Sequence, residues 1–190
     1  MNTATPAVTI GVGAVLLFVC VRFYNRLVSR RLAADNAFAT IDVQLKVRCD
    51  LVPRVVDAVR GYMEYERSVL EELTSLRAQA TAANLDAGRR LMFDGQIAGL
   101  LGRVFAAAEQ YPDLKAAGSV AMLQRTLNEV EAQIAAARRT YNAAVTEYNT
   151  QIEVFPANVV AGFFGFRRRA LFEAAAADRE PVQVTPLGAN

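Results

Sequence analysis

The sequence predicts an all-α protein: an N-terminal transmembrane helix that continues into an elongated antiparallel four-helix bundle. Three observations predict this fold class. The first 21 residues carry no charged side chain and are almost entirely apolar from Ala7 onward. Apolar residues then recur at steps of three and four, over long runs with little glycine or proline, as on one face of a helix. Strand-like alternation is absent until the last ten residues, which we expect to be extended or disordered.

The N-terminal segment is predicted to cross a membrane. Residues 7–21 read AVTIGVGAVLLFVCV, and Phe23 and Tyr24 extend the apolar stretch to about 18 residues, close to the roughly 20 that span a bilayer. A cleaved signal peptide would need basic residues ahead of this stretch, and residues 1–6 contain none. A lipoprotein signal ending at Cys20 is disfavoured because a bulky valine precedes it. We therefore expect a retained anchor.

The charges on the two sides of this segment predict its orientation. Four arginines follow the segment closely, and no lysine or arginine precedes it; they are Arg22, Arg26, Arg30 and Arg31. Under the positive-inside rule, the N-terminus lies outside and the rest of the chain lies in the cytoplasm. The predicted domains are residues 1–24 as the anchor, residues 25–176 as the helical bundle and residues 177–190 as a C-terminal tail.

Four helices account for the remaining pattern. The anchor helix is expected to continue to about residue 49, and a second helix to start after Asp50 with Pro53 in its first turn. A third apolar stripe runs over residues 93–108, and a fourth within 119–155 repeats as a helix seam for about four heptads. Connections are expected at about 50, 80–90 and 111–118. An up-down-up-down bundle follows; a solenoid is the alternative, but no repeat of its period is visible.

Composition excludes several functional classes. The chain has no histidine, which removes imidazole metal sites and Ser-His or Cys-His nucleophile pairs. Its 21 basic and 19 acidic residues leave a net charge of +2, too balanced to indicate nucleic-acid binding. Two cysteines, Cys20 and Cys49, form neither a disulfide framework nor a metal-ligand spacing. We expect no enzyme activity, cofactor, metal, nucleic-acid partner or small-molecule substrate.

Several phrases of the sequence are similar to those of a known family. They are YNRLV at 24–28, IDVQLKVRCDLVPRVVDAVRGYMEYE at 41–66, IAAARRTYNAAVTEYNTQIEVFPANVVAGFFGF at 134–166 and FEA at 172–174. With these motifs the chain resembles the LemA family over nearly its whole length, most weakly over residues 80–118. The resemblance implies one N-terminal membrane helix, an antiparallel helical bundle, a place in a bacterial inner (plasma) membrane and no established enzymatic activity.

The chain departs from the family at two places. A histidine is usual before the glutamate that follows GY, where this chain has Tyr65 before Glu66. The basic run Arg167–Arg169 replaces a pattern that often carries proline before an aromatic residue. Neither departure changes the expected fold, but a partner that reads either position would differ. A divergent branch of the family serves magnetosome membranes, and the sequence does not assign this chain to it.

A charged pair is expected across the bundle. Asp42 lies 18 residues beyond Tyr24 on the first helix, about 27 Å, and Arg138 lies 17 residues before Phe155 on the antiparallel fourth helix. At this common height we expect Asp42 to pair with Arg138 or its neighbour Arg139. Such a pair fixes register more often than it performs chemistry.

Two Tyr-Asn dipeptides, Tyr141-Asn142 and Tyr148-Asn149, repeat seven residues apart on the fourth helix. This separation puts both tyrosines on one face and both asparagines on the adjacent face. The tyrosines are expected to fill the seam and extend their hydroxyls to polar partners. The asparagines are expected to set alignment or oligomeric state, with a ligand-binding ladder as the alternative.

The segment after Pro156 is expected to lie at the bilayer surface. It places apolar side chains ahead of three arginines, a combination that suits anionic headgroups. The apolar residues are Val159, Val160, Phe163, Phe164 and Phe166, and the arginines are Arg167, Arg168 and Arg169. Arg22 and Arg26 are expected at the same level. The alternative is that the phenylalanines simply cap that end of the bundle, and the two interpretations are compatible.

Together these features predict a non-catalytic, membrane-anchored scaffold whose partners are the lipid bilayer, further copies of itself and other membrane proteins. Gly11, Gly13 and Ala14 leave room for close helix approach in the anchor, although they form no G-x-x-x-G motif. The competing hypothesis, from the resemblance alone, is an adaptor or regulator of a membrane protease or envelope-stress system. A third hypothesis is an enzyme that uses carboxylates alone.

Overall fold

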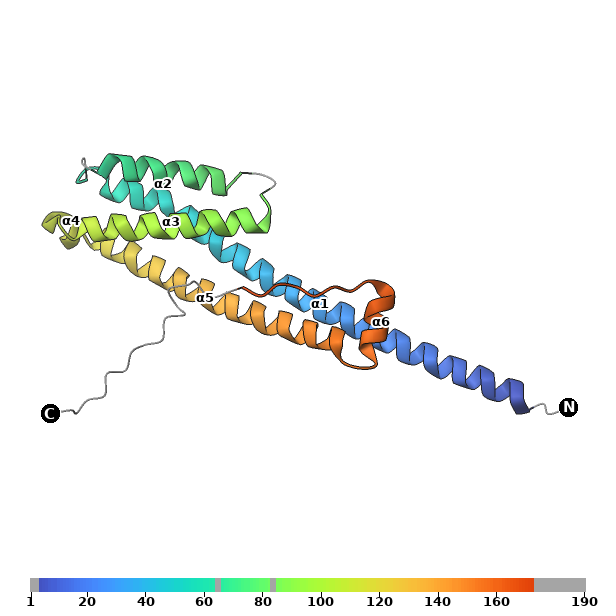
Figure 1. Cartoon of the computed structure of the whole chain (residues 1–190). Coiled ribbons are helices and arrows are strands. Elements are labelled where there is room, and N and C mark those ends of the chain that lie inside the picture. Colours follow the sequence, from blue (N-terminus) through green and yellow to red (C-terminus); the bar gives the residue numbers. More distant parts are fainter. Residues whose placement is uncertain (1–3, 64–65, 83–84, 173–190) are drawn as a thin grey trace, which may run out of the picture. The chain divides into compact units, whose positions relative to one another are not determined.

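The computed structural model describes residues 4–63, 66–82 and 85–172 (Figure 1). All regular secondary structure within these ranges is helical. The helices are α1 (Ala4–Val59), α2 (Arg67–Ala80), α3 (Ala87–Ala108), α4 (Pro112–Ala116), α5 (Gly118–Glu153) and α6 (Ala157–Phe164). The predicted all-α class and the long apolar N-terminal helix are confirmed. The tail expected at 177–190 and the departure at Tyr65 lie outside the described residues.

The chain divides into two compact units, and each is described by itself. The terminal unit comprises residues 1–34 with residues 141–190, and the central unit comprises residues 35–140. Both α1 and α5 contribute residues to each unit.

The break expected near residue 50 is wrong, because α1 continues through Pro53 to Val59. A proline inside a helix removes one backbone hydrogen bond and costs about 3 kcal/mol or more. The carbonyl that loses its partner is that of Cys49, four residues earlier, and Arg77 of α2 donates its Nε–H to this oxygen at 3.2 Å. Burial of Val52 and Val55 on either side of the proline adds about 1.5–3 kcal/mol each. A neighbouring helix therefore compensates for a residue that sequence rules place at a helix start.

Most of the core of the central unit comes from α1, α2, α3 and α5. Its buried apolar residues include Ile41, Leu45, Val52 and Val55 of α1, Val69, Leu70 and Leu73 of α2, Ile97, Leu101 and Val104 of α3, and Leu127, Val130 and Ile134 of α5. Helices α2 and α3 lie side by side (Figure 1). The helix α3 is long and apolar enough to cross a membrane by length and composition, but its buried stripe packs into this core.

The terminal unit is built around a small cluster. Leu27 of α1 is buried against Val160 and Ala161 of α6, with Cys20, Phe23, Ile152 and Phe166 partly buried around them. The helix α6 ends at Gly165, whose φ of 72° is the left-handed conformation that glycine adopts without strain. The N–H of Phe166 then bonds the carbonyl of Ala161 at 2.9 Å. Beyond this cap, residues 166–172 run without regular secondary structure, and we call them the strap.

Candidate functional site

The first functional feature is the N-terminal part of α1. Every residue from Gly11 to Val19 is exposed, and most of the side chains there are large and apolar. By length and composition this helix can cross a membrane. The first charged residue, Arg22, and the next, Arg26, are both exposed. An apolar helix surface of this length left uncovered needs a lipid or protein environment.

The second feature is the contact between α5 and the strap, where the two Tyr-Asn dipeptides lie. The side-chain amide of Asn149 donates to the carbonyl of Arg169 and accepts from its N–H, both at 2.9 Å. Asn142 does the same with Phe172, at 2.9 Å and 2.8 Å. Each asparagine thus pairs with the main chain of one strap residue as a neighbouring β-strand would.

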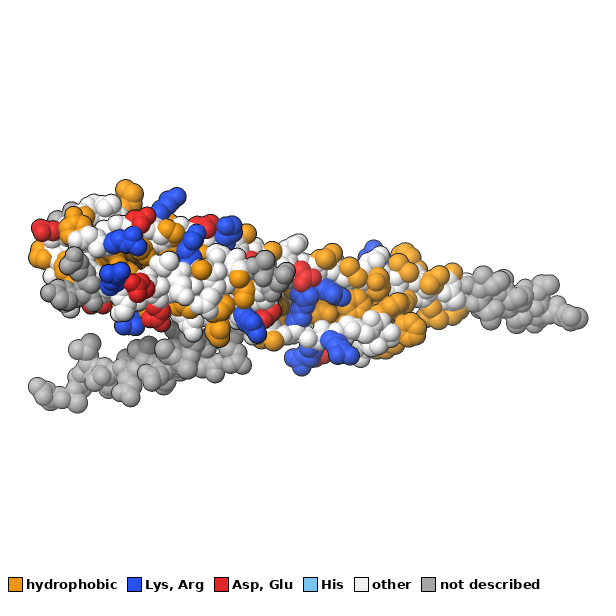
Figure 2. All heavy atoms as spheres, turned by 90° about the horizontal axis from the view of Figure 1, so that it is seen from above, with side chains coloured by type: hydrophobic (Ala, Val, Ile, Leu, Met, Phe, Trp, Pro, Cys, Tyr) orange, Lys and Arg blue, Asp and Glu red, His pale blue; other side chains and the backbone are white. Residues whose placement is uncertain are grey.

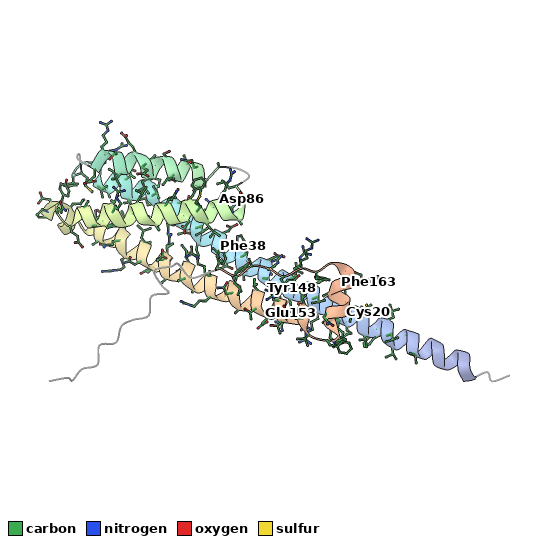
Figure 3. The ribbon with its side chains drawn as sticks, in the orientation of Figure 1. Cys20, Phe38, Asp86, Tyr148, Glu153 and Phe163 are labelled. Atoms are coloured by element: carbon green, nitrogen blue, oxygen red, sulfur yellow. The ribbon has the colours of Figure 1, made fainter. Side chains whose placement is uncertain are left out.

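The tyrosines repeat the same relation. The hydroxyl of Tyr148 donates to the carbonyl of Arg167 at 3.1 Å, and that of Tyr141 donates to the carbonyl of Ala170 at 3.2 Å. Tyr148 is almost fully buried, and its labelled position on α5 can be followed in Figure 3. Both pairs of contacts step back seven residues along α5 and forward three residues along the strap.

This spacing has a geometric cause. Seven residues of α-helix rise about 10.5 Å, and three residues of extended chain span about 10 Å. A heptad repeat on α5 therefore matches every third residue of an extended strap that runs in the opposite direction. The Tyr-Asn repeat is a ladder that holds the strap, and we call it the Tyr-Asn ladder. The polar partners expected for the tyrosine hydroxyls are main-chain groups of the chain itself, and the asparagines, expected to set alignment or oligomeric state, bond the main chain as well. The sequence signal for these contacts is the seven-residue repeat.

The ladder decides where the arginines of the basic run lie. Arg167 and Arg168 are exposed, and Arg168 forms an ion pair with Glu153 at 3.0 Å. The guanidinium of Arg169 instead lies 5.9 Å from the ring centroid of Tyr148, over its face. Two arginines of the three therefore face solvent, and the third packs on α5.

The predicted apolar segment also divides into two sets. Val160 is 9% exposed and packs inward, whereas Val159, Phe163 and Phe164 are exposed, Phe163 at 84%. Phe166 is half-buried and its ring centroid lies 5.8 Å from that of Tyr24. Figure 3 shows Phe163 on α6, with Cys20 on the neighbouring stretch of α1.

The third feature is a buried charge network in the central unit. The Arg48 side chain is 4% exposed and that of Asp94 is 3% exposed, and their Nη1 and Oδ1 atoms lie 2.9 Å apart. Arg48 also donates to Glu131, and Arg138 Nη2 lies 3.5 Å from the second oxygen of Asp94. Burial raises the pKa of Asp94, while Arg48 and Arg138 act to lower it. Two guanidinium groups on one carboxylate make a structural joint between α1, α3 and α5.

The pair expected between Asp42 and either Arg138 or Arg139 is wrong. Asp42 forms its ion pair with Arg90 of α3, and Arg138 reaches Asp94 on the same helix. The prediction rested on the equal distance of Asp42 and Arg138 along the first and fourth helices. It did not consider α3, which supplies the partner of each residue. The sequence signal for the role of α3 is Asp94, a lone aspartate inside an otherwise apolar stripe of that helix.

A family model described as the LemA family matches residues 37–185. The chain belongs to the LemA family. The resemblance read from the IDVQLK, DLVP and YN phrases is thereby confirmed, and the matched region contains both the Tyr-Asn ladder and the charge network.

Three relatives show the range of LemA-like proteins that this chain is similar to. Protein LemA of Metamycoplasma hominis is 28% identical over 179 residues, covering 94% of this chain and 80% of the relative. Magnetosome protein MamQ of Magnetospirillum gryphiswaldense is 34% identical over 188 residues, covering 86% and 69%. Magnetosome protein MamQ 2 of Paramagnetospirillum magneticum is 37% identical over 93 residues, covering 49% and 34%. The family and the apolar helix together indicate a membrane-associated helical protein.

Proposed function

We propose that this chain is a membrane-anchored, non-catalytic assembly protein whose copies associate through the anchor part of α1. The observation that carries the proposal is the uncovered apolar surface of α1 from Gly11 to Val19. The helix seam predicted in α5 does not offer a second surface for association. Its residues Val130, Ile134 and Ala137 are buried in the central unit.

The proposed location is a bacterial inner membrane, crossed once with the N-terminus outside and the bundle in the cytoplasm. The arginines on one side of the anchor support this orientation. Fusions at the C-terminus test it: a green fluorescent protein should fluoresce, and alkaline phosphatase, which needs an oxidising compartment, should stay inactive. Active phosphatase with a dark fluorescent fusion would reverse the orientation.

The names of the relatives support a structural role, because neither "Protein LemA" nor "Magnetosome protein MamQ" names a reaction. In the part of the chain that the structure describes, no group of three or more cysteine, aspartate or glutamate side chains is placed to hold a metal ion. A scaffold needs only a surface that a partner can contact.

Two glycines make the association testable. A Cβ added at Gly11 or Gly13 meets no atom within 4 Å outside the adjoining backbone of its own helix, so we expect larger side chains there to leave the monomer undisturbed. They do prevent a second helix from approaching closely. We expect light scattering of the full-length protein in detergent to give a discrete multimer, and Gly11→Leu/Gly13→Leu to give a monomer. Val15→Leu in the same helix is the control, because it keeps the surface bulky and apolar.

The alternatives give different outcomes in this measurement. Multimers of equal mass in both variants would move association away from the anchor glycines. Monomers in the wild-type protein would contradict self-association and favour the adaptor hypothesis, with a specific partner to be recovered from detergent extracts.

A further inference from the structure

The helix α6 is packed with its small residues inward and its large residues outward. Ala157, Val160 and Ala161 are buried, the last two in the cluster around Leu27, whereas Phe163 is exposed. A surface helix in water buries its largest apolar side chains, because burial removes the most apolar area from solvent. The packing of α6 is the reverse of what water favours.

The outward residues form one patch together with the turn that precedes the helix. The rings of Phe163 and Phe164 are in contact, with centroids 5.1 Å apart. We call this patch the α6 face; its residues are Val154, Phe155, Val159, Phe163 and Phe164. Figure 2 shows hydrophobic side chains gathered over the part of the terminal unit that contains α6 and the N-terminal part of α1. A contiguous apolar patch of this kind marks a binding surface.

The α6 face lies at a defined level of α1. Tyr24 packs its ring on Phe164, with centroids 4.8 Å apart, and Cys20 and Phe23 pack on the inner side of α6. This is the stretch where the uncovered apolar surface of α1 ends and Arg22 begins the charged part. In a helix that crosses a bilayer, such a stretch lies at the boundary between acyl chains and headgroups.

Two further observations fit that boundary. The helix α6 runs across α1 rather than along it (Figure 1), as an amphipathic helix lying in the interface plane does. Exposed arginines adjoin it at both chain segments: Arg22 and Arg26 on α1, and Arg167 and Arg168 on the strap. Cations beside an apolar face complement anionic headgroups.

We propose that the α6 face is a second membrane contact, which inserts its phenylalanines at the headgroup boundary of the bilayer that α1 crosses, with anionic phospholipids as its ligands. The inference rests on the proposed membrane anchor. The Tyr-Asn ladder holds the strap, and through it Arg167 and Arg168, against the same unit. The terminal unit is thereby attached to the bilayer at two places rather than through α1 alone.

The chain contains no tryptophan, so a single introduced indole reports on one position. We would place it at Phe163, whose exposed ring tolerates the change, in the full-length protein reconstituted into vesicles of phosphatidylethanolamine and phosphatidylglycerol. Lipids brominated near the headgroup or near the chain end quench tryptophan according to its depth. We expect F163W to emit at shorter wavelength than in water, and to lose most of its emission to the shallow bromines.

Two controls separate this inference from the anchor itself. F18W, in the apolar part of α1, should be quenched by the deep bromines if α1 spans the bilayer. L171W lies on the strap beside Ala170, which is bonded to Tyr141, about 18 Å before the end of α5, and it should not be quenched.

Three outcomes would contradict the second membrane contact, and they also show whether the anchor stands. Quenching of F18W without quenching of F163W would overturn the second contact and leave the anchor standing, including the case where F163W emits at short wavelength because protein covers it. No quenching at either position would overturn both. Quenching at all three positions would mean that the whole unit is immersed, and would also overturn the inference.

The role of anionic headgroups has its own test. We expect F163W to be quenched less in vesicles of phosphatidylcholine alone, and Arg167→Glu/Arg168→Glu to give a similar loss in the phosphatidylglycerol vesicles. Equal quenching in all three samples would remove anionic lipid as the ligand.

Discussion

Each of the two units of this protein is held together internally by a different kind of polar contact. In the terminal unit, neutral side chains of α5 bond the main chain of the strap, at four steps of one ladder. In the central unit, charged side chains from three helices meet in the interior at Asp94. The ladder bonds main-chain groups of the strap and therefore tolerates many side chains there. The network bonds side chains to each other and therefore depends on each of them. From this difference we expect that the Tyr-Asn ladder can open locally and that the charge network cannot.

The surroundings explain why. A hydrogen bond between neutral groups contributes about 0.5–1.5 kcal/mol and is replaced by water when it opens. The Arg48 side chain is 4% exposed, so when it loses Asp94 its charge stays in the interior and only the exposed Glu131 still compensates it. We therefore expect changes in the ladder to release the strap, and changes in the network to unfold the central unit.

The largest effect is expected from Asp94→Ala. It takes away the buried carboxylate partner of Arg48 and leaves only the exposed Glu131 in contact with it, which destabilises by about 3–5 kcal/mol. Urea unfolding of the full-length protein in detergent, followed by circular dichroism, measures this loss. Asp50→Ala is the matched control, because its partner Lys46 lies one turn away on an exposed face and the pair contributes under about 0.5 kcal/mol.

A double variant tests whether the central unit depends on the charges of the network. Arg48→Met/Asp94→Leu replaces the pair with apolar side chains, which in buried sites is often neutral or stabilising. We expect the double variant to recover most of the stability that Asp94→Ala loses. If it were as unstable as the single variant, the network would owe its importance to shape rather than to charge.

The second effect is local and smaller. Asn149→Ala removes both bonds to Arg169, and about 1–3 kcal/mol of strap attachment with them. Hydrogen exchange of the strap should quicken, while exchange in α3 stays unchanged. Asn158→Ala, an exposed asparagine on α6, is the control. Asn142→Ala should act at Phe172 in the same sense. Equal acceleration in strap and α3 would contradict the local character of the ladder.

These regions differed in how far the sequence alone could describe them. Helix class, the anchor and the importance of the Tyr-Asn repeat follow from apolar periodicity and a heptad spacing, which are local properties of one segment. The strap was not foreseen, because its seven residues have no pattern of their own; the pattern belongs to α5. The sequence therefore shows the α5 side of this contact, as the Tyr-Asn repeat, but it does not show that the strap is the partner.

The errors have a common cause in contacts between segments. The sequence predicts Pro53 at a helix start, because the contact in which Arg77 donates to the carbonyl of Cys49 joins two helices and leaves no local signal. Asp42 was paired with Arg138 by height on two helices, although α3 supplies Arg90 and Asp94. Local rules fail where a residue from a third helix satisfies the group in question.

A further prediction concerns the dependence of stability on pH. Because burial raises the pKa of Asp94 above its ordinary value of 3.8, the folded protein holds this proton at pH values where the unfolded chain has released it. Stability therefore falls as the pH rises from about 3.8 through the folded pKa, by about 1.4 kcal/mol for each unit of rise. Urea unfolding across this range should show the fall in the wild type and not in Arg48→Met/Asp94→Leu, where Asp94 is absent. A parallel pH dependence in both would assign it to other groups.

The smallest effect is expected for an exposed ion pair, which compares the two units within one type of interaction, the pairing of arginine with a carboxylate. The terminal unit has an ion pair of its own, Arg30 with Glu147, but both side chains stay exposed, at 41% and 58%. Water already solvates these charges, so Glu147→Gln should cost less than about 1 kcal/mol, and salt should screen what remains. Urea unfolding at low and high salt measures both. The same pairing of arginine with carboxylate then differs several-fold between the units, and burial is the variable that changes. A loss from Glu147→Gln as large as that from Asp94→Ala would show instead that the two units respond to charge alike.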